Sequence, residues 1–245
     1  MELAAKLARG ADKVLSLLAA LMILLLLCYG GYSLWDTAML YKGAFNTSDL
    51  LQYKPSEDQP DSLTFEELLA INPDVCAWIT VDDTHIDYPV VQGEDDMEYV
   101  NKDVYGDFAF SGAIFLSSQN QREFSDSYNL LYGHHMDGGA MFGDVIDFQE
   151  KDYFDSRKSG TLYLPGKAIP ITFFACVSTD AFDSVIYRPD AQPQGDVSSL
   201  LAHIQGTAVQ YREIGVTAQD QIIGLSTCSE AVTNGRVVLF GRLDK

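Results

Sequence analysis

Hydrophobic and polar residues divide the chain into one apolar N-terminal stretch and a long region of short alternating runs. Residues 14–35 are 22 positions without a charge, and about 20 apolar residues are enough to cross a bilayer as a helix. Further on, short β-rich runs alternate with turns, which predicts a closed or sandwiched all-β domain. The expected strands are residues 77–81, 85–91, 113–116, 129–132, 161–164, 169–177, 221–227 and 236–242.

Two helices are expected within this β-rich pattern. The first begins at Thr64, whose hydroxyl can cap the helix while Glu67 reaches back, and it ends near Pro73. The second is predicted from Asp196, a plausible N-cap, to Tyr211, and it lies in an insertion before the strand at 221–227. Its apolar stripe consists of Val197, Leu200, Leu201, Ile204, Ala208 and Tyr211.

The apolar stretch favours an uncleaved transmembrane anchor over a cleaved signal peptide. Signal peptides have apolar regions of about 7–15 residues that end at a small-residue cleavage site. No A-x-A site follows this stretch. Residues 25–28 resemble a lipoprotein signal that ends in Cys28, but Leu27 is bulkier than the small residue usually found at such a cleavage site. Basic residues (Lys6, Arg9 and Lys13) precede the stretch and Asp36 follows it, so the positive-inside rule leaves residues 1–13 in the cytoplasm and residues 36–245 outside the cell.

Composition separates a linker from a globular domain. Residues 36–61 lack a steady hydrophobic period and contain Pro55 and Pro60 among polar residues, which indicates a stalk or linker. Residues 62–245 form the expected globular domain. The chain of 245 residues is 47% hydrophobic, which is too rich for a disordered protein.

Net charge excludes one class of partner. The chain has 16 Lys and Arg against 35 Asp and Glu, a formal net charge of −19. Residues 49–107 alone hold 16 acidic residues and two lysines, Lys54 and Lys102. Nucleic-acid binding requires clustered basic residues, so a nucleic-acid partner is excluded.

The four cysteines follow neither a disulfide pattern nor a metal-binding pattern. Cys28 lies in the apolar stretch, and Cys76, Cys176 and Cys228 are far apart with no C-x-x-C. Cys76 and Cys176 sit in apolar runs and are expected to be buried. Cys228 ends an apolar run beside polar residues, which makes it the candidate reactive thiol.

Three segments hold candidate chemistry: the pair His134 and His135, the thiol of Cys228, and Arg236. Neighbouring residues of a strand point to opposite faces, so one histidine at most faces Cys228, which is too few ligands for a zinc site. The acidic segments do not form a calcium loop either. Nucleophilic catalysis needs a thiolate, an imidazole and a cation or hydrogen-bond donor at the oxyanion. Arg236 follows Cys228 by eight residues, and this spacing lets two neighbouring antiparallel strands place both side chains at one site.

These segments resemble the class B sortases, membrane-anchored cysteine transpeptidases of Gram-positive surfaces, over roughly residues 62–245. The resemblance is carried by Y-G-H-H-M at 132–136, G-A-M-F at 139–142, L-S-T-C at 225–228 and N-G-R at 234–236, with N-P-D-V-C-A-W-I at 72–79, I-D-Y-P-V-V-Q at 86–92 and G-A-I-F-L at 112–116. Cys76 departs from the family, where a small residue such as Gly is common.

The resemblance implies a fold and a set of site residues. The fold is an eight-stranded barrel with added N-terminal helices and a long helix before the strand that ends in the catalytic cysteine. The implied catalytic residues are Cys228, His134 and Arg236, whereas His135 matches no catalytic position. Weaker candidates for substrate binding are Ser226, Thr227 and Glu230, and no metal or cofactor is implied.

The implied activity is cleavage of an Asn-Pro-x-Thr-type sorting motif after Thr, through a thioacyl-enzyme, followed by transfer of the surface protein to an amine of the cell wall. Partners would be surface proteins with C-terminal sorting motifs and a peptidoglycan precursor. A pilin-polymerising sortase, with a pilin amine as acceptor, remains an alternative. Two further alternatives are a surface cysteine peptidase that releases its product by hydrolysis and a membrane-anchored adhesin without enzymatic activity.

Overall fold

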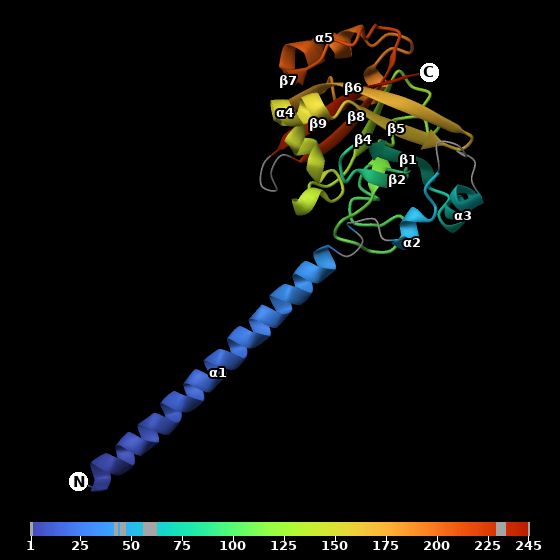
Figure 1. Ribbon diagram of the computed structural model, residues 1–245. Helices are drawn as coiled ribbons and strands as arrows, with labels where there is room; N and C mark the ends of the chain where they lie inside the picture. The colour runs from blue at the N-terminus through green and yellow to red at the C-terminus, as the bar shows by residue number, and fades with distance from the viewer. Residues whose placement is uncertain (1, 42–43, 45–47, 56–62, 229–233, 245) are drawn as a thin grey trace. The chain divides into compact units, whose positions relative to one another are not determined.

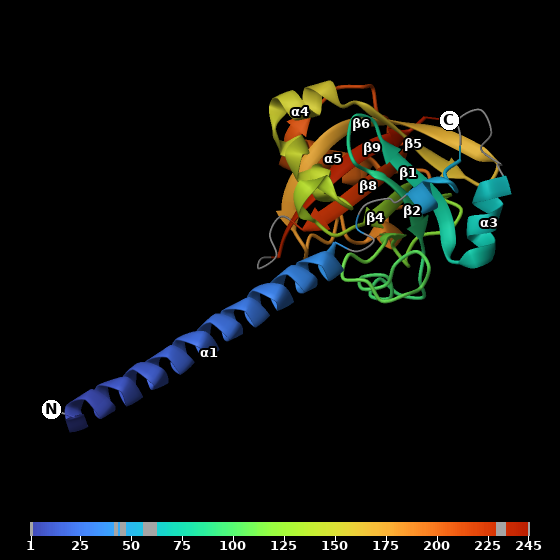
Figure 2. The same ribbon diagram turned by 60° about the horizontal axis from the view of Figure 1, so that its bottom comes forward.

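A computed structural model describes residues 2–41, 44, 48–55, 63–228 and 234–244 (Figures 1 and 2). The chain divides into two compact units, Met1–Tyr41 and Lys42–Lys245. The expected boundary between anchor and linker, after residue 35, therefore falls inside the first unit.

The first unit is a single long helix, α1 (Glu2–Leu40). Its segment Ala5–Met39 has a mean hydropathy of 2.5 over its most apolar window, and none of that window is buried. By length and composition this helix is able to cross a membrane, as the uncharged stretch at 14–35 predicts. The helix continues through residues 36–40, which were expected to belong to the linker.

Part of the expected linker packs on the second unit. The short helix α2 (Ser48–Leu51) buries Leu50 in an apolar cluster. The carbonyl of Ala44, itself fully buried, accepts a hydrogen bond of 2.8 Å from the hydroxyl of Tyr88. Lys54 forms an ion pair of 2.7 Å with Asp87. Residues 44 and 48–55 thus belong to the folded domain.

The second unit is built on a closed, mixed β-barrel. Its strands are β1 (Val75–Val81), β2 (Asp87–Val91), β3 (Ile114–Leu116), β4 (Tyr128–Tyr132), β5 (Ser159–Leu164), β6 (Lys167–Asp180), β7 (Ala208–Tyr211), β8 (Gln221–Cys228) and β9 (Gly235–Leu243). Eight of them follow the order β5-β1-β2-β3-β4-β8-β9-β6, and β6 pairs again with β5 to close the barrel. The β2–β3 and β4–β8 pairs are parallel and the others are antiparallel. The predicted eight-stranded barrel is confirmed, and each expected strand overlaps an observed one.

Strand β7 was not predicted, and it corrects the expected helix at 196–211. Helix α5 (Ser198–Thr207) ends at Thr207, and β7 follows directly and pairs with β6 through Ala208, Gln210 and Tyr211. Alternate residues of β7 are half-buried, the pattern of a strand with one face against the protein. Asp196 is not the N-cap either, because Val197 holds that position, although the Asp196 carboxylate does accept a hydrogen bond from the amide of Ser198.

The N-terminal helix of the domain also begins earlier than predicted. Helix α3 (Leu63–Ile71) already includes Thr64, so Thr64 is not the residue that precedes the helix. The helix ends just before Asn72 and Pro73, close to the predicted end. Phe65 and Leu68 point from it into the apolar cluster on β1. This cluster fixes α3 to one side of the barrel.

Short helices fill the connection between β4 and β5 and the segment after β6. They are η1 (Asp137–Gly139), η2 (Gly143–Gln149), α4 (Lys151–Ser156) and η3 (Pro189–Ala191). Helix α5 lies beside β6, away from α3 (Figure 1). Its residues Leu200 and Ile204 are fully buried among Phe174, Val177 and Phe240. Each such aliphatic side chain stabilises the packing by about 1.5–3 kcal/mol.

Candidate active site

The ends of β8 and β9 bring a thiol and a guanidinium together. In the antiparallel register of these strands, Cys228 lies directly opposite Arg236. Directly opposed residues of an antiparallel pair project from the same face, with Cβ atoms about 4.5–5.5 Å apart. Both side chains are half-buried, and one terminal nitrogen of Arg236 donates a 3.0 Å hydrogen bond to the carbonyl of Gly235.

The parallel pairing of β4 with β8 places His134 at the same end of the barrel. Tyr132 pairs with Ser226, and the amide of Gly133 donates to the Ser226 carbonyl over 3.1 Å. The hydroxyl of Thr227 returns a 2.9 Å hydrogen bond to the carbonyl of Gly133. His134 therefore follows directly after the last hydrogen bonds between β4 and β8, and β8 lies between β4 and the strand that carries Arg236.

Glycine at position 133 is required by packing. A Cβ atom there would overlap Cδ1 of Ile114 and the ring of Phe142. The close approach of these side chains fixes the backbone from which His134 extends. The glycine of the Y-G-H-H-M motif thus allows the backbone to pass between Ile114 and Phe142, and this path places His134 at the site.

The two adjacent histidines have different surroundings. The Nε2 atom of His134 is 2.7 Å from the carbonyl oxygen of Val100, and the side chain is half-buried. His135 is exposed, and its backbone forms an isolated bridge with Met141. His134 lines the cavity described next, whereas His135 is absent from that lining.

A cavity of about 380 Å³ lies over this end of the barrel. Its lining combines the ends of β4, β8 and β9 with the segment before β3 and the segment after β6. The lining residues are Asp96, Met97, Val100, Phe115, Tyr132, Gly133, His134, Ala181, Tyr187, Ser226, Thr227, Cys228 and Arg236. Five of the six predicted site residues are thus brought together, and Glu230 lies outside the described residues.

Tyr132 and Tyr187 lie in the cavity wall, and neither is among the site residues that the sequence predicts. The rings of Tyr132 and Tyr187 stack with centroids 6.3 Å apart and planes 15° apart. The Tyr187 hydroxyl is 3.0 Å from the hydroxyl of Ser226. Burial raises the pKa of Tyr187 to about 12 and also raises the pKa of Tyr132. Both phenols therefore remain neutral hydrogen-bond donors at neutral pH.

Ser226 and Thr227 are almost completely buried, although both contribute to the cavity lining. Their hydroxyls already have protein partners, Tyr187 and the Gly133 carbonyl. Thr227 thus connects the end of β8 to the residue after β4, and Ser226 connects β8 to Tyr187 in the cavity wall.

The other two cysteines of the domain are in the core. Cys76 and Cys176 are buried, and burial raises the pKa of each thiol to about 12. Among the cysteines described in this unit, Cys228 is the one that is not buried. Because the thiolate is the reactive form, the two core thiols are expected to be inert.

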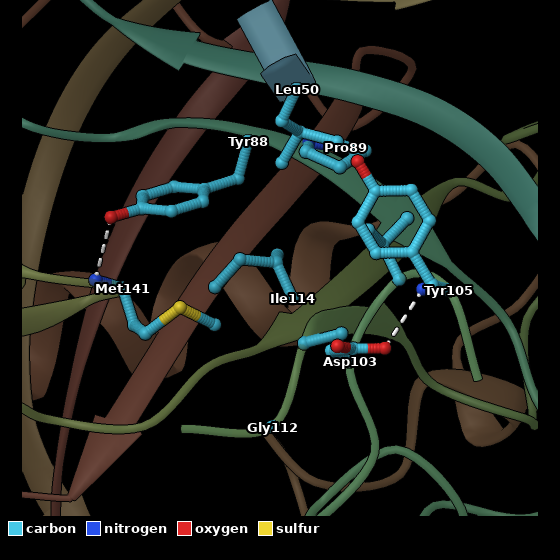
Figure 3. Close-up of a pocket in the computed structure, with 10 residues that line it drawn as sticks. Leu50, Tyr88, Pro89, Asp103, Tyr105, Gly112, Ile114 and Met141 are labelled. Atoms are coloured by element: carbon cyan, nitrogen blue, oxygen red, sulfur yellow. Dashed lines mark hydrogen bonds between the residues drawn. The ribbon is translucent and has the colours of Figure 1, made fainter. Parts of the chain in front are cut away.

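A second, smaller cavity of about 60 Å³ lies between α2, β2 and the segment 103–113 (Figure 3). Leu50, Tyr88, Ile114 and Met141 face it. The Tyr88 hydroxyl, which donates to Ala44, accepts a 2.9 Å hydrogen bond from the amide of Met141. Among the described residues that line this cavity, none is a predicted site residue.

Comparisons with known proteins place the chain in one family, although no family model matches it. Sortase B of Listeria monocytogenes is 27% identical over 243 residues, which cover 94% of this chain and 98% of that protein. A Streptococcus pyogenes class B sortase involved in pilus biogenesis is 43% identical in the superposed structures, with a TM-score of 0.67, covering 74% of this chain and 97% of that one. A mutant form of Clostridium perfringens sortase B is 30% identical, with a TM-score of 0.74, and the match covers 80% of this chain and 96% of that one.

The chain belongs to the class B sortases. It is therefore a sortase transpeptidase that uses a cysteine nucleophile.

Proposed function

We propose that Cys228 is the nucleophile, His134 the general acid and base, and Arg236 the group that holds the substrate carbonyl and its oxyanion. The observation that carries this assignment is that all three side chains line one cavity, with Cys228 and Arg236 as direct partners across β8 and β9. A nucleophile, an acid–base group and a cationic donor at one site are what acyl transfer requires.

In the first half-reaction the thiolate of Cys228 attacks the carbonyl carbon of the Thr residue in a sorting motif. The electron pair of the C=O bond moves to oxygen, where Arg236 donates hydrogen bonds to the oxyanion. The oxyanion then collapses, the peptide C–N bond breaks, and protonated His134 gives its proton to the leaving amine. The product is a thioacyl-enzyme and a free amine.

In the second half-reaction an acceptor amine attacks the thioester carbon. Neutral His134 takes the proton from the attacking amine, and the Cys228 thiolate leaves as the new amide forms. A carbonyl oxygen is an acceptor only, so the contact with Val100 requires the hydrogen of His134 to be on Nε2. Nδ1 is then the nitrogen that exchanges protons with the substrate and acceptor.

We further propose that the donor is an Asn-Pro-x-Thr-type sorting motif near the C-terminus of a surface protein and that the acceptor is an amine of the cell wall. The class B assignment supports this choice of motif. The anchor helix α1 would hold the enzyme in the cell membrane, with the domain outside, because Lys6, Arg9 and Lys13 precede the uncharged stretch and Asp36 follows it.

A second candidate acceptor is the amine of a pilin subunit. The sortase involved in pilus biogenesis is 43% identical to this chain, whereas the Clostridium perfringens and Listeria monocytogenes sortases are 30% and 27% identical. The two candidates share every step up to the thioacyl-enzyme and differ in the amine that resolves it.

The test uses the full chain in detergent micelles with a panel of sorting peptides. Each peptide is supplied with a glycine-type amine, with a lysine-containing pilin peptide, or with neither, and the products are analysed by mass. An amide joined to the glycine-type amine supports wall attachment, and an amide joined to the lysine supports pilin polymerisation. Hydrolysis alone in all three mixtures would indicate a cysteine peptidase, and no cleavage would indicate a binding protein. Cys228→Ala is the control for each reaction.

A further inference from the structure

One half-buried carboxylate outside the cavity, that of Asp183, accepts hydrogen bonds from four donors. Asp183, whose side chain is 12% exposed, accepts from the hydroxyl of Thr179 over 2.8 Å and from Nε2 of His203 over 2.7 Å. It also accepts from the amides of Val185 and Ile186 over 3.0 and 3.3 Å. Charge-assisted hydrogen bonds are about twice as strong as neutral ones, so four donors hold the Asp183 carboxylate firmly in one position.

Asp183 is connected to two sides of the active-site cavity, through Thr179 on one side and through its own backbone carbonyl on the other. Thr179 lies directly opposite Arg236 in the β6–β9 pairing. On the other side of Asp183, its backbone carbonyl accepts a 2.9 Å hydrogen bond from the amide of Tyr187. Tyr187 forms part of the cavity wall and contacts Ser226, two residues before the proposed nucleophile. The turn at 183–187 therefore determines where the ring of Tyr187 lies.

The fourth partner, His203, comes from a helix that is anchored independently. It lies on α5 beside Ile204 and one turn from Leu200, both of which are fully buried in the apolar cluster against β6. The helix therefore keeps its place through apolar packing, and the imidazole reaches out from it to hold the turn. His203 itself does not line the cavity.

We propose that Asp183 and His203 are positioning residues for transpeptidation: the pair ties the turn at 183–187 to α5 and so holds Tyr187 in the wall against which the substrate peptide lies. The inference rests on the proposed function of the cavity. Burial raises the pKa of Asp183, but the hydrogen bonds from His203, Thr179 and the two amides outweigh burial and keep this pKa below its ordinary value. The carboxylate is thus charged at neutral pH, as the proposal requires.

The experiment compares His203→Ala and His203→Gln in the full chain. Gln places an amide N–H where His places Nε2–H, so it restores the donor to Asp183. His85→Ala is the matched control, because His85 forms a similar pair with Asp144 over 3.0 Å and does not line the cavity. Three quantities are measured: kcat/KM for cleavage of a sorting peptide, the rate of Cys228 alkylation by iodoacetamide, and the thermal unfolding midpoint.

We expect His203→Ala to lower kcat/KM for the peptide about tenfold or more, since a displaced wall misplaces the substrate. Alkylation of Cys228 should change less than about twofold, because a small reagent needs the thiolate and not the wall. His203→Gln should recover most of the peptide activity, and His85→Ala should retain it. If His203→Ala does not fold, Thr179→Val removes one donor with little change of shape and should show the same split between peptide and iodoacetamide.

Equal peptide activity in His203→Ala and the unaltered enzyme would overturn the proposal. Parallel losses in peptide cleavage, alkylation and unfolding midpoint would overturn it as well, because they would assign the pair a purely structural role. Failure of the proposed function looks different: the unaltered enzyme would not cleave the peptide, or Cys228→Ala would still cleave it.

Discussion

Cys228 and Arg236 are direct partners in the antiparallel pairing of β8 and β9, at the end of the ladder where both strands meet the cavity. The backbone hydrogen bonds of the barrel therefore set the separation of the two Cβ atoms. A thiol and a guanidinium on paired backbone positions are preorganised for the proposed reaction, in which charge develops on the substrate carbonyl oxygen.

The first prediction concerns the geometry of Arg236. A guanidinium offers several donors in a fixed plane, whereas a lysine offers one mobile charge, so Arg236→Lys should lose nearly as much activity as Arg236→Ala. Removing an oxyanion donor typically costs about 100- to 1,000-fold in kcat. Peptide binding should change less, because the charge appears on the way to the tetrahedral intermediate. Steady-state kinetics of both variants measure this, and near-normal turnover by folded Arg236→Ala would reduce Arg236 to a structural strand residue.

The second prediction separates the neighbouring histidines. His134 lines the cavity and contacts the Val100 carbonyl, whereas His135 is exposed and lies outside the lining. His134→Ala should lose about 100- to 10,000-fold in rate, the usual contribution of a general acid. His135→Ala should remain largely active. Peptide cleavage assays on both variants decide the matter, and exchanged results would mean that the wrong histidine has been assigned.

The third prediction is a loss of stability in alkali that involves a core thiol. Burial raises the pKa of Cys176 from 9.0 to about 12 in the folded protein. Between these two pKa values the thiol keeps its proton in the folded state and loses it in the unfolded state. The contribution of this thiol to the free energy of unfolding is therefore full below pH 9 and declines as the pH rises toward 12. Unfolding midpoints across this range should fall less steeply for Cys176→Ala than for the unaltered protein. Identical slopes would show that the thiol does not titrate as its burial requires.

The fourth prediction concerns the orientation of the anchor. Lys6, Arg9 and Lys13 should keep the N-terminus in the cytoplasm. A protease added to intact cells without a wall should then remove the domain beyond about residue 36 and leave the first dozen residues protected. Antibodies to tags at the two ends would report the fragments. Protection of the domain would mean reversed insertion and a cytoplasmic substrate.

Much of the barrel was predictable because its strands are short apolar runs separated by clear turns. β7 was not, because Ala208 and Tyr211 fall at helical spacing from Leu200 and Ile204, and over four residues a helical and a strand period look alike. The spacing of Thr64 and Glu67 predicts a cap at Thr64, but the observed helix already includes Thr64.

The candidate site likewise contains some residues that are predictable from the sequence and others that are not. Cys228, Arg236 and His134 are predictable because they lie in short motifs, and strand pairing then brings these motifs together. Tyr187 and Asp183 lie about 40 residues before Cys228 in a segment without a motif, and their connection to the cavity depends on the path of the chain after β6 and on the placement of α5. The sequence does not encode such contacts as a local pattern.

The measurement that tests the account most directly is the intact mass of the enzyme during turnover of a sorting peptide. The enzyme should carry an adduct equal in mass to the acyl portion of the peptide, located on the fragment that contains Cys228 and released when an amine is added. Cys228→Ala should form no adduct and no product, whereas Cys76→Ala and Cys176→Ala should retain both at a cost of about 1 kcal/mol of stability each. An adduct on another residue, or cleavage retained in Cys228→Ala, would contradict the assignment of Cys228 as the nucleophile.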